Sequence, residues 1–256
     1  MRKRTNPKSQ NKPAEQPETL AYPARLNKFI SNAGICSRRD ADVLIAEGKI
    51  KINDKLVTEL GTKVEFDDVV KFNGKVIKPQ NYAYILLNKP KDYITTMDDP
   101  EKRKTVMQLI KGSTEARIYP VGRLDRNTTG LLLFTNDGDL SQKLTHPSYK
   151  IKKIYQVELD KPLTAFHFQE IAKGITLDDG PVKIDEIVIL SEDKKSIGVQ
   201  IHVGKNRIVR RIFEHFEYEV VKLDRTMYGQ LTKKELPKGK WRNLTEREVV
   251  VLKNLS

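Results

Sequence analysis

The sequence predicts an α+β protein with two folded parts. Residues 24–72 combine two short helical patterns with strand-like segments, and residues 84–252 mix apolar strand-like runs with further helical patterns. The Gly, Pro and Asn residues of 73–83 indicate a linker between them. We therefore expect a small N-terminal α/β module, followed by a larger domain built on a mostly antiparallel sheet.

The composition points to a polyanionic partner. Lys and Arg number 47 against 34 Asp and Glu, which gives a net charge of +13 and an isoelectric point of 9.6. The single cysteine, Cys36, excludes an intramolecular disulfide and a cysteine-rich metal cluster and fits a reducing cytosol. The N-terminus has no apolar segment of the signal-peptide kind, and no apolar stretch approaches the roughly 20 residues of a membrane span. We expect a cytoplasmic protein without membrane contact.

Residues 1–22 are rich in Lys, Arg, Asn, Gln and Pro and hold few large apolar side chains. Such a composition cannot repay the entropy of ordering, so a flexible basic arm is predicted. A solubilising tail without a partner is an equally good interpretation.

Two helices joined at a glycine are predicted in residues 24–72. Leu26, Phe29, Ile30 and Ala33 recur at helical spacing, and Gly34 ends the pattern. A second helix is predicted after Ser37, an N-cap candidate, and it ends before Gly48; its apolar positions are Ala41, Leu44 and Ile45. KIKINDKLV then predicts a strand and a turn, with strand-like sequence up to about residue 77.

The second part contains longer elements. YILLNKP reads as a buried strand, and KIYQVEL and SIGVQIHV as further strands. KLTHP, AFHFQEIAKG and NRIVRRIFEHF predict helices. The run LLLF at 131–134 predicts a strand that is buried on both faces.

Metal and nucleotide sites are not indicated. The histidines have no metal-ligand spacing with one another or with Cys36, and GVQIHVGKN fails the phosphate-loop pattern. The TNDGD segment lacks the spaced oxygen ligands of a calcium loop. We expect no metal and no cofactor.

The remaining candidate for chemistry is Asp125. It lies between Arg123 and Arg126, on a polar turn directly before the apolar strand. Loop residues held by a rigid scaffold often carry catalysis, yet Asp before Asn-Thr-Thr is also an ordinary turn former. From these residues alone, the structural interpretation is the better one.

A resemblance changes this interpretation. GRLDRNTTGLLLFTNDG resembles the signature of the pseudouridine synthases of the RsuA/RluB type, which act on ribosomal RNA. NKPKDYITTMDDP, KKIYQVEL, GKNRIVRRIFEHFEYEVVKLDRTMYG and LPKGKWRNLT agree with the same family in the expected order, and residues 24–72 resemble the S4 RNA-binding module. The resemblance covers about residues 24–250 and implies an S4-like module followed by a pseudouridine synthase catalytic domain, with no metal or organic cofactor.

The resemblance also implies three catalytic residues. Asp125 matches the family's aspartate, which is thought to act as nucleophile or base, and Arg210 matches its basic partner. Arg207 lies three residues from Arg210 on the same helical face, so the two can exchange roles. Tyr155 matches the active-site tyrosine, whose ring can stack on an extruded uracil, although strand core is the alternative for a single tyrosine. Ile208 departs from the polar residue that the family commonly carries there.

Basic residues are expected to hold the RNA backbone, although a solvated surface remains the alternative for any one of them. The candidates are Arg25, Lys28, Arg38 and Arg39 in the S4-like module and Lys89, Arg123, Arg126, Lys205 and Arg207 in the catalytic domain. We therefore expect a monomer that converts a specific uridine of ribosomal RNA, or of its assembly precursor, with the large subunit favoured. The alternative is a non-catalytic RNA chaperone or ribosome-assembly factor that uses the same surface.

Overall fold

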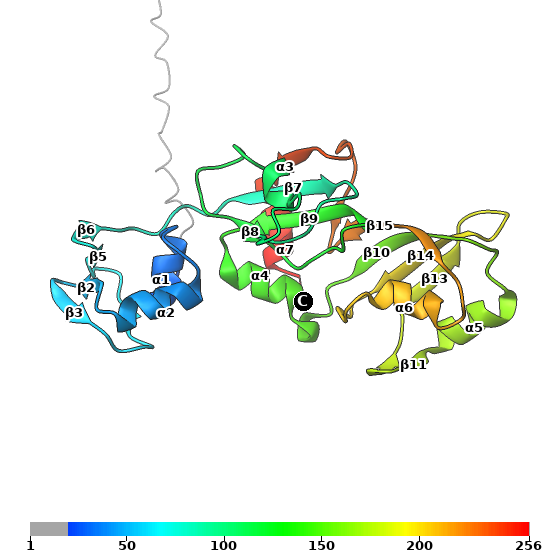
Figure 1. Cartoon of the computed structure of the whole chain (residues 1–256), viewed down its shortest axis with the longest axis horizontal. Coiled ribbons are helices and arrows are strands. Elements are labelled where there is room, and N and C mark those ends of the chain that lie inside the picture. Colours follow the sequence, from blue (N-terminus) through cyan, green and yellow to red (C-terminus); the bar gives the residue numbers. More distant parts are fainter. Residues whose placement is uncertain (1–19, 256) are drawn as a thin grey trace, which may run out of the picture. The chain divides into compact units, whose positions relative to one another are not determined.

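The computed structural model of the chain describes residues 20–255, so most of the predicted basic arm lies outside the described residues. The described residues form two compact units, which fall within residues 1–82 and 83–256 and which we call unit 1 and unit 2. Figure 1 labels their helices and strands. Within residues 20–255, no helix has both the length and the apolar composition that crossing a bilayer requires.

Unit 1 begins with the two predicted helices, α1 (Leu26–Asn32) and α2 (Arg38–Ala46). The side chain of Ser37 caps α2 by accepting a hydrogen bond from the backbone N–H of Asp40, as predicted. Gly34 and Gly48 both have positive φ angles, of 80° and 68°, where each helix has ended. The helix boundaries thus follow from local sequence, because glycine adopts this backbone conformation without a steric penalty.

Short antiparallel strands complete unit 1. The main sheet has the order β3-β2-β5-β6, and a separate pair joins β1 to β4. The apolar faces of both helices pack on these strands in one core, which includes Leu26, Ile30 and Ile50. The strands are β1 (Ala24–Arg25), β2 (Ile50–Ile52), β3 (Lys55–Val57), β4 (Lys63–Val64), β5 (Val70–Phe72) and β6 (Lys75–Val76).

Both edges of unit 1 extend beyond the predicted module. Leu20, in the predicted arm, is 3% exposed, and Tyr22 packs edge-on against Phe66. At the other end, the predicted linker contains β6, which pairs with β5, and the following Ile77 packs against the core. A few isolated apolar residues form no periodic pattern. The sequence of these two segments therefore did not indicate that their apolar side chains are buried by tertiary contacts.

Unit 2 is built around one large sheet, with a main path β13-β14-β10-β15-β9-β7-β17. All of its pairings are antiparallel except β9 with β15, so the expected α+β class and the mostly antiparallel sheet are confirmed. The strands of this sheet are β7 (Tyr84–Lys89), β8 (Tyr119–Pro120), β9 (Thr129–Thr135), β10 (Lys153–Leu159), β13 (Glu186–Ile189), β14 (Ser196–Ile201), β15 (Val220–Tyr228), β16 (Leu231–Thr232) and β17 (Trp241–Asn243). A separate hairpin joins β11 (Ile175–Leu177) and β12 (Gly180–Val182).

Strand β9 is buried on both faces, as its apolar run predicted. Leu132 and Phe134 belong to one hydrophobic core, and Leu131 and Leu133 belong to the core on the opposite face. Successive side chains of a strand point to opposite faces, so both faces need apolar residues where both are covered. This strand therefore provides a rigid support directly behind the loop that carries Asp125.

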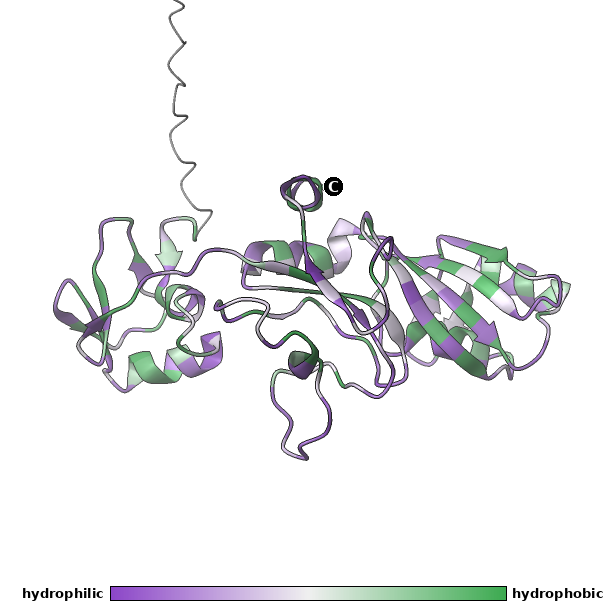
Figure 2. Ribbon diagram, turned by 90° about the horizontal axis from the view of Figure 1, so that it is seen from above, coloured by the Kyte–Doolittle hydropathy of each residue, from purple (hydrophilic) through white to green (hydrophobic). Residues whose placement is uncertain are grey.

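The helices of unit 2 cover the sheet unevenly. The faces of β7 and β9 are covered on both sides. In β10, the buried Tyr155, Val157 and Leu159 alternate with the more exposed Gln156 and Glu158, as expected for a strand with one solvated face. Figure 2 shows hydrophilic and hydrophobic residues mixed along the strands of unit 2. The helices are α3 (Val106–Leu109), α4 (Gly138–Thr145), α5 (Ala165–Lys173), α6 (Ile208–Glu214) and α7 (Glu246–Lys253), with a 3₁₀ turn at Pro147–Tyr149.

The parallel pairing of β9 with β15 depends on Gly130. Its φ angle is 106°, and it lies opposite Arg225 in the register. A Cβ at this position would lie 2.2 Å from the carbonyl oxygen of Arg225, which is far inside contact distance. Glycine therefore allows the two backbones to meet just after the Asp125 loop, and so fixes that loop beside β15.

Candidate active site

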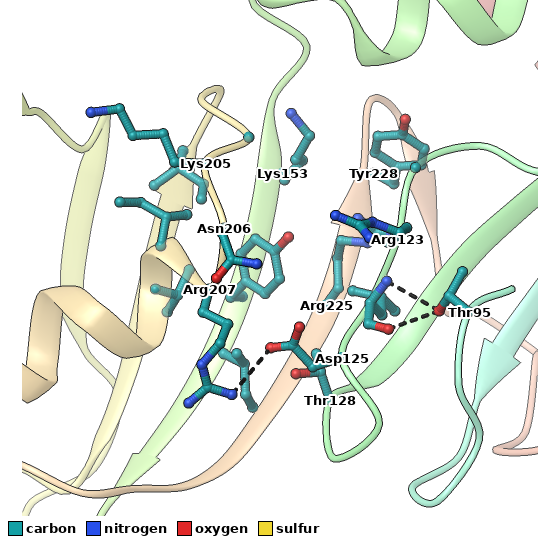
Figure 3. A pocket seen from close by; sticks show the side chains of 18 of the residues that line it. Thr95, Arg123, Asp125, Thr128, Lys153, Lys205, Asn206, Arg207, Arg225 and Tyr228 are labelled. Atoms are coloured by element: carbon teal, nitrogen blue, oxygen red, sulfur yellow. Dashed lines mark hydrogen bonds and ion pairs between the residues drawn. The ribbon is translucent and has the colours of Figure 1, made fainter. Parts of the chain in front are cut away.

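A cavity of about 500 Å³ opens beside the start of β9 in unit 2. The loop of residues 121–128 forms one wall, and most other lining residues come from β10, β15 and residues 203–209, with residues 94–95 and 144–145 at the side. Figure 3 shows Asp125 and Arg207 reaching toward one another across this cavity. Six basic side chains and a single carboxylate line it: Arg123, Arg126, Lys153, Lys205, Arg207, Arg225 and Asp125.

The loop that carries Asp125 is fastened to the segment after β7. Thr95 donates its hydroxyl to the carbonyl oxygen of Leu124 at 2.7 Å, and its oxygen accepts from the Leu124 N–H at 3.2 Å. Asp92 binds the same loop twice, with its backbone N–H on the Arg126 carbonyl at 3.0 Å and its carboxylate 3.3 Å from the Arg126 guanidinium. Two motifs that are distant in sequence thus form one structural element.

Lys89, predicted to contact RNA phosphates, instead holds this loop from inside. The residue is completely buried, and its Nζ donates to the carbonyl oxygens of Pro90, Asp125, Arg126 and Thr128 at 2.8–3.1 Å. Burial lowers the pKa of Lys89 to about 8, against the attraction of the Asp125 and Asp92 carboxylates. The prediction of an RNA contact was wrong, because the backbone carbonyls of the loop enclose the ammonium.

The carboxylate of Asp125 lies 3.8 Å from the guanidinium of Arg207. Both side chains are partly exposed, at 37% and 45%, so each remains accessible from the cavity. Arg207 is the N-cap residue of α6 and has a left-handed backbone, with φ of 44°. This conformation is uncommon for a residue with a side chain, and here it aims the arginine at the cavity.

Arg210, the predicted partner of Asp125, has a different contact. Its side chain is buried, its Nη1 donates to the carbonyl oxygen of Val220 at 2.8 Å, and its Nε has no hydrogen-bond partner. Burial and the neighbouring Arg207 lower its pKa, against the attraction of Asp125 and Glu214. The ion pair with Asp125 therefore comes from Arg207, because the fold turns the Arg210 guanidinium toward β15.

Tyr155 lines the same cavity from β10. Only 8% of the residue is exposed, because it also belongs to the core between the sheet and α6. It lies opposite Arg225 on β15, next to an irregularity in the register between Ile154 and Tyr155. Core packing thus fixes the position of the ring at the cavity wall. Tyr155 can therefore be both a core residue of its strand and a residue of the active site.

The other predicted RNA contacts of unit 2 differ in their surroundings. Arg123 and Arg126 are exposed on the loop around Asp125. Lys205 extends away from Asp125 in Figure 3, and its Nζ donates to the carbonyl oxygen of Asp179 at 2.9 Å. It therefore ties the turn between β11 and β12 to the segment before α6.

Unit 1 places its four predicted RNA contacts at the helix pair. Arg25 precedes α1 and is exposed, and Lys28 is half-buried on α1. Arg38 and Arg39 are exposed in the first turn of α2, and Arg38 donates to the side-chain oxygen of Asn27 at 3.4 Å. The first turn of α2 therefore lies against α1, which brings these basic residues into one region.

Two cavity residues, Lys153 and Arg225, were not predicted. Lys153 lies two positions before Tyr155 in KKIYQVEL, and Arg225 lies in KLDRTMYG, both within segments that carry the family resemblance. In both segments the residues two positions before and after the basic residue are apolar or aromatic, so a basic residue on the apolar face of a strand is a signal that could have indicated them. Among residues 20–255, no group of three or more His, Cys, Asp or Glu side chains could hold a metal ion.

The comparisons with known proteins assign the family. A sequence model of the RNA pseudouridylate synthases matches residues 83–215, and a model of the S4 domain matches residues 24–70. The chain thus belongs to the RNA pseudouridylate synthase family and carries an S4 domain before its catalytic part. It is an RNA pseudouridine synthase, and the expected resemblance is confirmed.

Its relatives support the same assignment over nearly the whole length. A "Ribosomal large subunit pseudouridine synthase B" of Bacillus subtilis (strain 168) is 42% identical, over 91% of this chain and 96% of its own. An "Uncharacterized RNA pseudouridine synthase" of Aquifex aeolicus (strain VF5) is 41% identical, over 89% and 93%. A solved structure, "Crystal structure of pseudouridylate synthase", covers 90% of this chain and 99% of its own, with a TM-score of 0.64 and 29% identity.

Proposed function

We propose that this chain converts a specific uridine of ribosomal RNA to pseudouridine, and that the target lies in the large-subunit RNA. The observation that supports the reaction is the Asp125 carboxylate, which lies in a cavity with six basic side chains. Support for the substrate comes from the Bacillus subtilis relative, whose name specifies the large ribosomal subunit. RNA carries one negative charge per nucleotide, so the basic lining suits it.

Within this proposal, Asp125 acts on the bond between uracil and ribose, as nucleophile or base. Both roles use the carboxylate. The guanidinium of Arg207, at 3.8 Å, and the buried guanidinium of Arg210 place positive charge beside it. Tyr155 offers its ring to the extruded uracil.

Binding of the RNA must also bring the target uridine into the cavity. The target uridine leaves its stack to enter the cavity, which costs a few kcal/mol and less in a loop than in a duplex. Contacts to the RNA backbone, from the exposed Arg123 and Arg126 and from the basic residues of the S4 domain, offset this cost. We further propose a monomer in the cytoplasm, because a reducing compartment suits a chain whose sequence holds a single cysteine.

The decisive experiment compares wild type with Asp125→Asn. Both proteins are incubated with ribosomal RNA that lacks the modification, and pseudouridine is mapped across both subunits. We expect the wild type to convert one large-subunit uridine and Asp125→Asn to convert none while binding RNA with nearly unchanged affinity. Glu192→Gln, which neutralises an exposed carboxylate between β13 and β14, is the matched control and should remain active.

Two other outcomes would redirect the proposal. A wild type that binds ribosomal RNA but converts no uridine would favour the alternative of a chaperone or assembly factor. Conversion of a small-subunit uridine would retain the reaction and overturn the choice of subunit.

A further inference from the structure

Two cations, the half-buried Lys153 and the buried Arg225, line the cavity beside the Asp125–Arg207 pair, and the proposed chemistry does not use either of them. Lys153 begins β10, and Arg225 lies on the neighbouring strand β15. In Figure 3, Lys153 and Tyr228 lie toward one edge of the cavity and the Asp125–Arg207 ion pair lies toward the other, with Arg225 between them. The cavity thus has a cationic end that is separate from its carboxylate.

Arg225 is buried without a carboxylate partner. It is 3% exposed, its Nε donates to the carbonyl oxygen of Leu131 at 2.8 Å, and its guanidinium lies 4.6 Å from the centre of the Tyr228 ring. Its Nη2 has no hydrogen-bond partner, and no ion pair involves it among residues 20–255. A buried guanidinium group with a free donor is costly unless an acceptor from outside completes it.

Lys153 has the same deficiency. Its Nζ donates to the carbonyl oxygens of Ile151 at 3.1 Å and His202 at 2.8 Å, which leaves one of its three N–H groups for a ligand. Burial and the charge of Arg225 lower its pKa to about 8, and Asp185 opposes this only in part. The carboxylate of Asp185 contacts the ring of His202 at 2.6 Å, and among residues 20–255 it forms no ion pair with the Lys153 ammonium.

We propose that Lys153 and Arg225 form a subsite for a phosphate group of the RNA, namely the one on the 5′ or the 3′ side of the target uridine. Uracil and ribose are neutral, so the phosphate is the part of the substrate that can pair with the buried guanidinium of Arg225 and the half-buried ammonium of Lys153. The inference rests on the proposed function, since it assumes that the uridine enters this cavity. Its chemical effect is orientation, because a fixed phosphate sets the position of the attached ribose against Asp125.

The subsite has a defined pH dependence. Lys153 binds an anion only when it is protonated, so affinity for the phosphate falls as the pH rises through about 8. The groups that face it are Arg225 and Tyr228 on β15, His202 at the end of β14, and Asp185 before β13. Burial raises the pKa of Tyr228 to about 12, so this tyrosine stays neutral throughout the range.

The test measures direct binding of three probes by ligand-observed NMR: uridine, uridine 5′-monophosphate and uridine 3′-monophosphate. With wild type at about pH 7, we expect one monophosphate to bind about ten-fold more tightly than uridine, as a charge-assisted contact implies. Lys153→Met should reduce this advantage to about two-fold or less, whereas Lys152→Met, which removes an exposed neighbouring charge, should keep it. At about pH 9.5 the wild type should lose most of the advantage, and Lys153→Arg should retain it.

Two results would overturn the subsite. One is that neither monophosphate binds wild type better than uridine, and the other is that Lys153→Met keeps the full advantage. Thermal unfolding of the Lys153 variants checks that they fold, which we expect because this side chain is only partly buried and both replacements keep most of its volume. Probe binding requires no turnover, so a wild type that binds the phosphate but converts no uridine would contradict the proposed function and not the subsite.

Discussion

The ammonium of Lys89 holds the Asp125 loop in place. Four backbone carbonyls surround it, three of them from residues 125–128. Because a loop has no ladder of hydrogen bonds of its own, these contacts supply the order that a strand would obtain from its neighbours. Catalysis by Asp125 would therefore depend on a residue that cannot touch the substrate.

Replacing Lys89 with Met should reduce both stability and turnover. The change keeps most of the side-chain volume but leaves buried carbonyl oxygens without a donor, which should cost about 2–4 kcal/mol in the free energy of unfolding. In the folded variant we expect kcat to fall about ten-fold or more, with little change in KM, because the loop loses its position and the RNA contacts remain. Urea unfolding and pseudouridine-formation kinetics measure the two effects.

The control for Lys89→Met is Lys91→Met. Lys91 is exposed two residues further along the chain, so its replacement should change the free energy of unfolding by less than about 0.5 kcal/mol. Equal destabilisation by the two variants would contradict an anchoring role for Lys89.

At the scale of elements, β9 is supported from both faces, and α7 contributes to the side opposite α5 and α6. Leu252 of α7 packs in the core that contains Leu131 and Leu133 of β9. The start of α7 is a capping box: Thr245 accepts from the Glu248 N–H, and Glu248 accepts from the Thr245 N–H. Glu248 also forms a bidentate pair with Arg242 of β17, with both oxygen–nitrogen distances at 2.7 Å.

This contact should make the stability of unit 2 depend on acid pH. Arg242 and the Thr245 backbone lower the pKa of Glu248 to about 2 from an ordinary value of 4.5. A carboxyl group with a lowered pKa contributes its stability above the ordinary value and loses it as the pH falls toward the lowered one. Glu248→Gln should therefore cost about 2 kcal/mol near neutral pH, after allowance for partial exposure, and progressively less between about pH 4.5 and 2.

Urea unfolding of wild type and Glu248→Gln, at about pH 7 and about pH 3, tests this expectation. A difference in stability that is the same at both pH values would show that the Glu248 charge is not responsible. Glu246→Gln is the matched control, because it removes a carboxylate from the same helical turn and leaves the pair of Glu248 with Arg242 in place.

At the scale of the whole molecule, each unit has its own hydrophobic core. The described core of unit 1 uses residues from 20 to 77, and the cavity with Asp125 is lined entirely by residues of unit 2. The S4 domain in unit 1 and the proposed catalytic groups in unit 2 thus belong to parts of the chain with separate cores. Unit 1 can therefore be removed without exposing the core of unit 2.

A chain of residues 83–256 should therefore fold and retain slow activity on ribosomal RNA. The S4 domain carries Arg25, Lys28, Arg38 and Arg39, so its loss should weaken RNA binding and lower the slope of log affinity against log salt by several units. Filter binding at several salt concentrations measures this slope. An unchanged slope would mean that the basic residues of the S4 domain do not contact the RNA backbone.

Sequence patterns predicted those features that depend on neighbours in the chain. The cap at Ser37, the glycine turns at Gly34 and Gly48 and the double burial of β9 were correctly predicted, because each follows from backbone conformation or strand periodicity. The partners of charged side chains were less predictable. The local sequence around Lys89 would be the same whether its ammonium contacted RNA phosphates or backbone carbonyls of the protein.

The sequence by itself determined the α+β class and, through its motifs, the family. Only the tertiary structure decided that Arg207 and not Arg210 forms the ion pair with Asp125, and that Lys153 and Arg225 share its cavity. The physical reason is distance: periodicity and propensity act over a few residues, whereas the cavity joins groups more than 80 positions apart. Their geometry is set by the parallel pairing of β9 with β15 at Gly130, a long-range contact that no local pattern specifies.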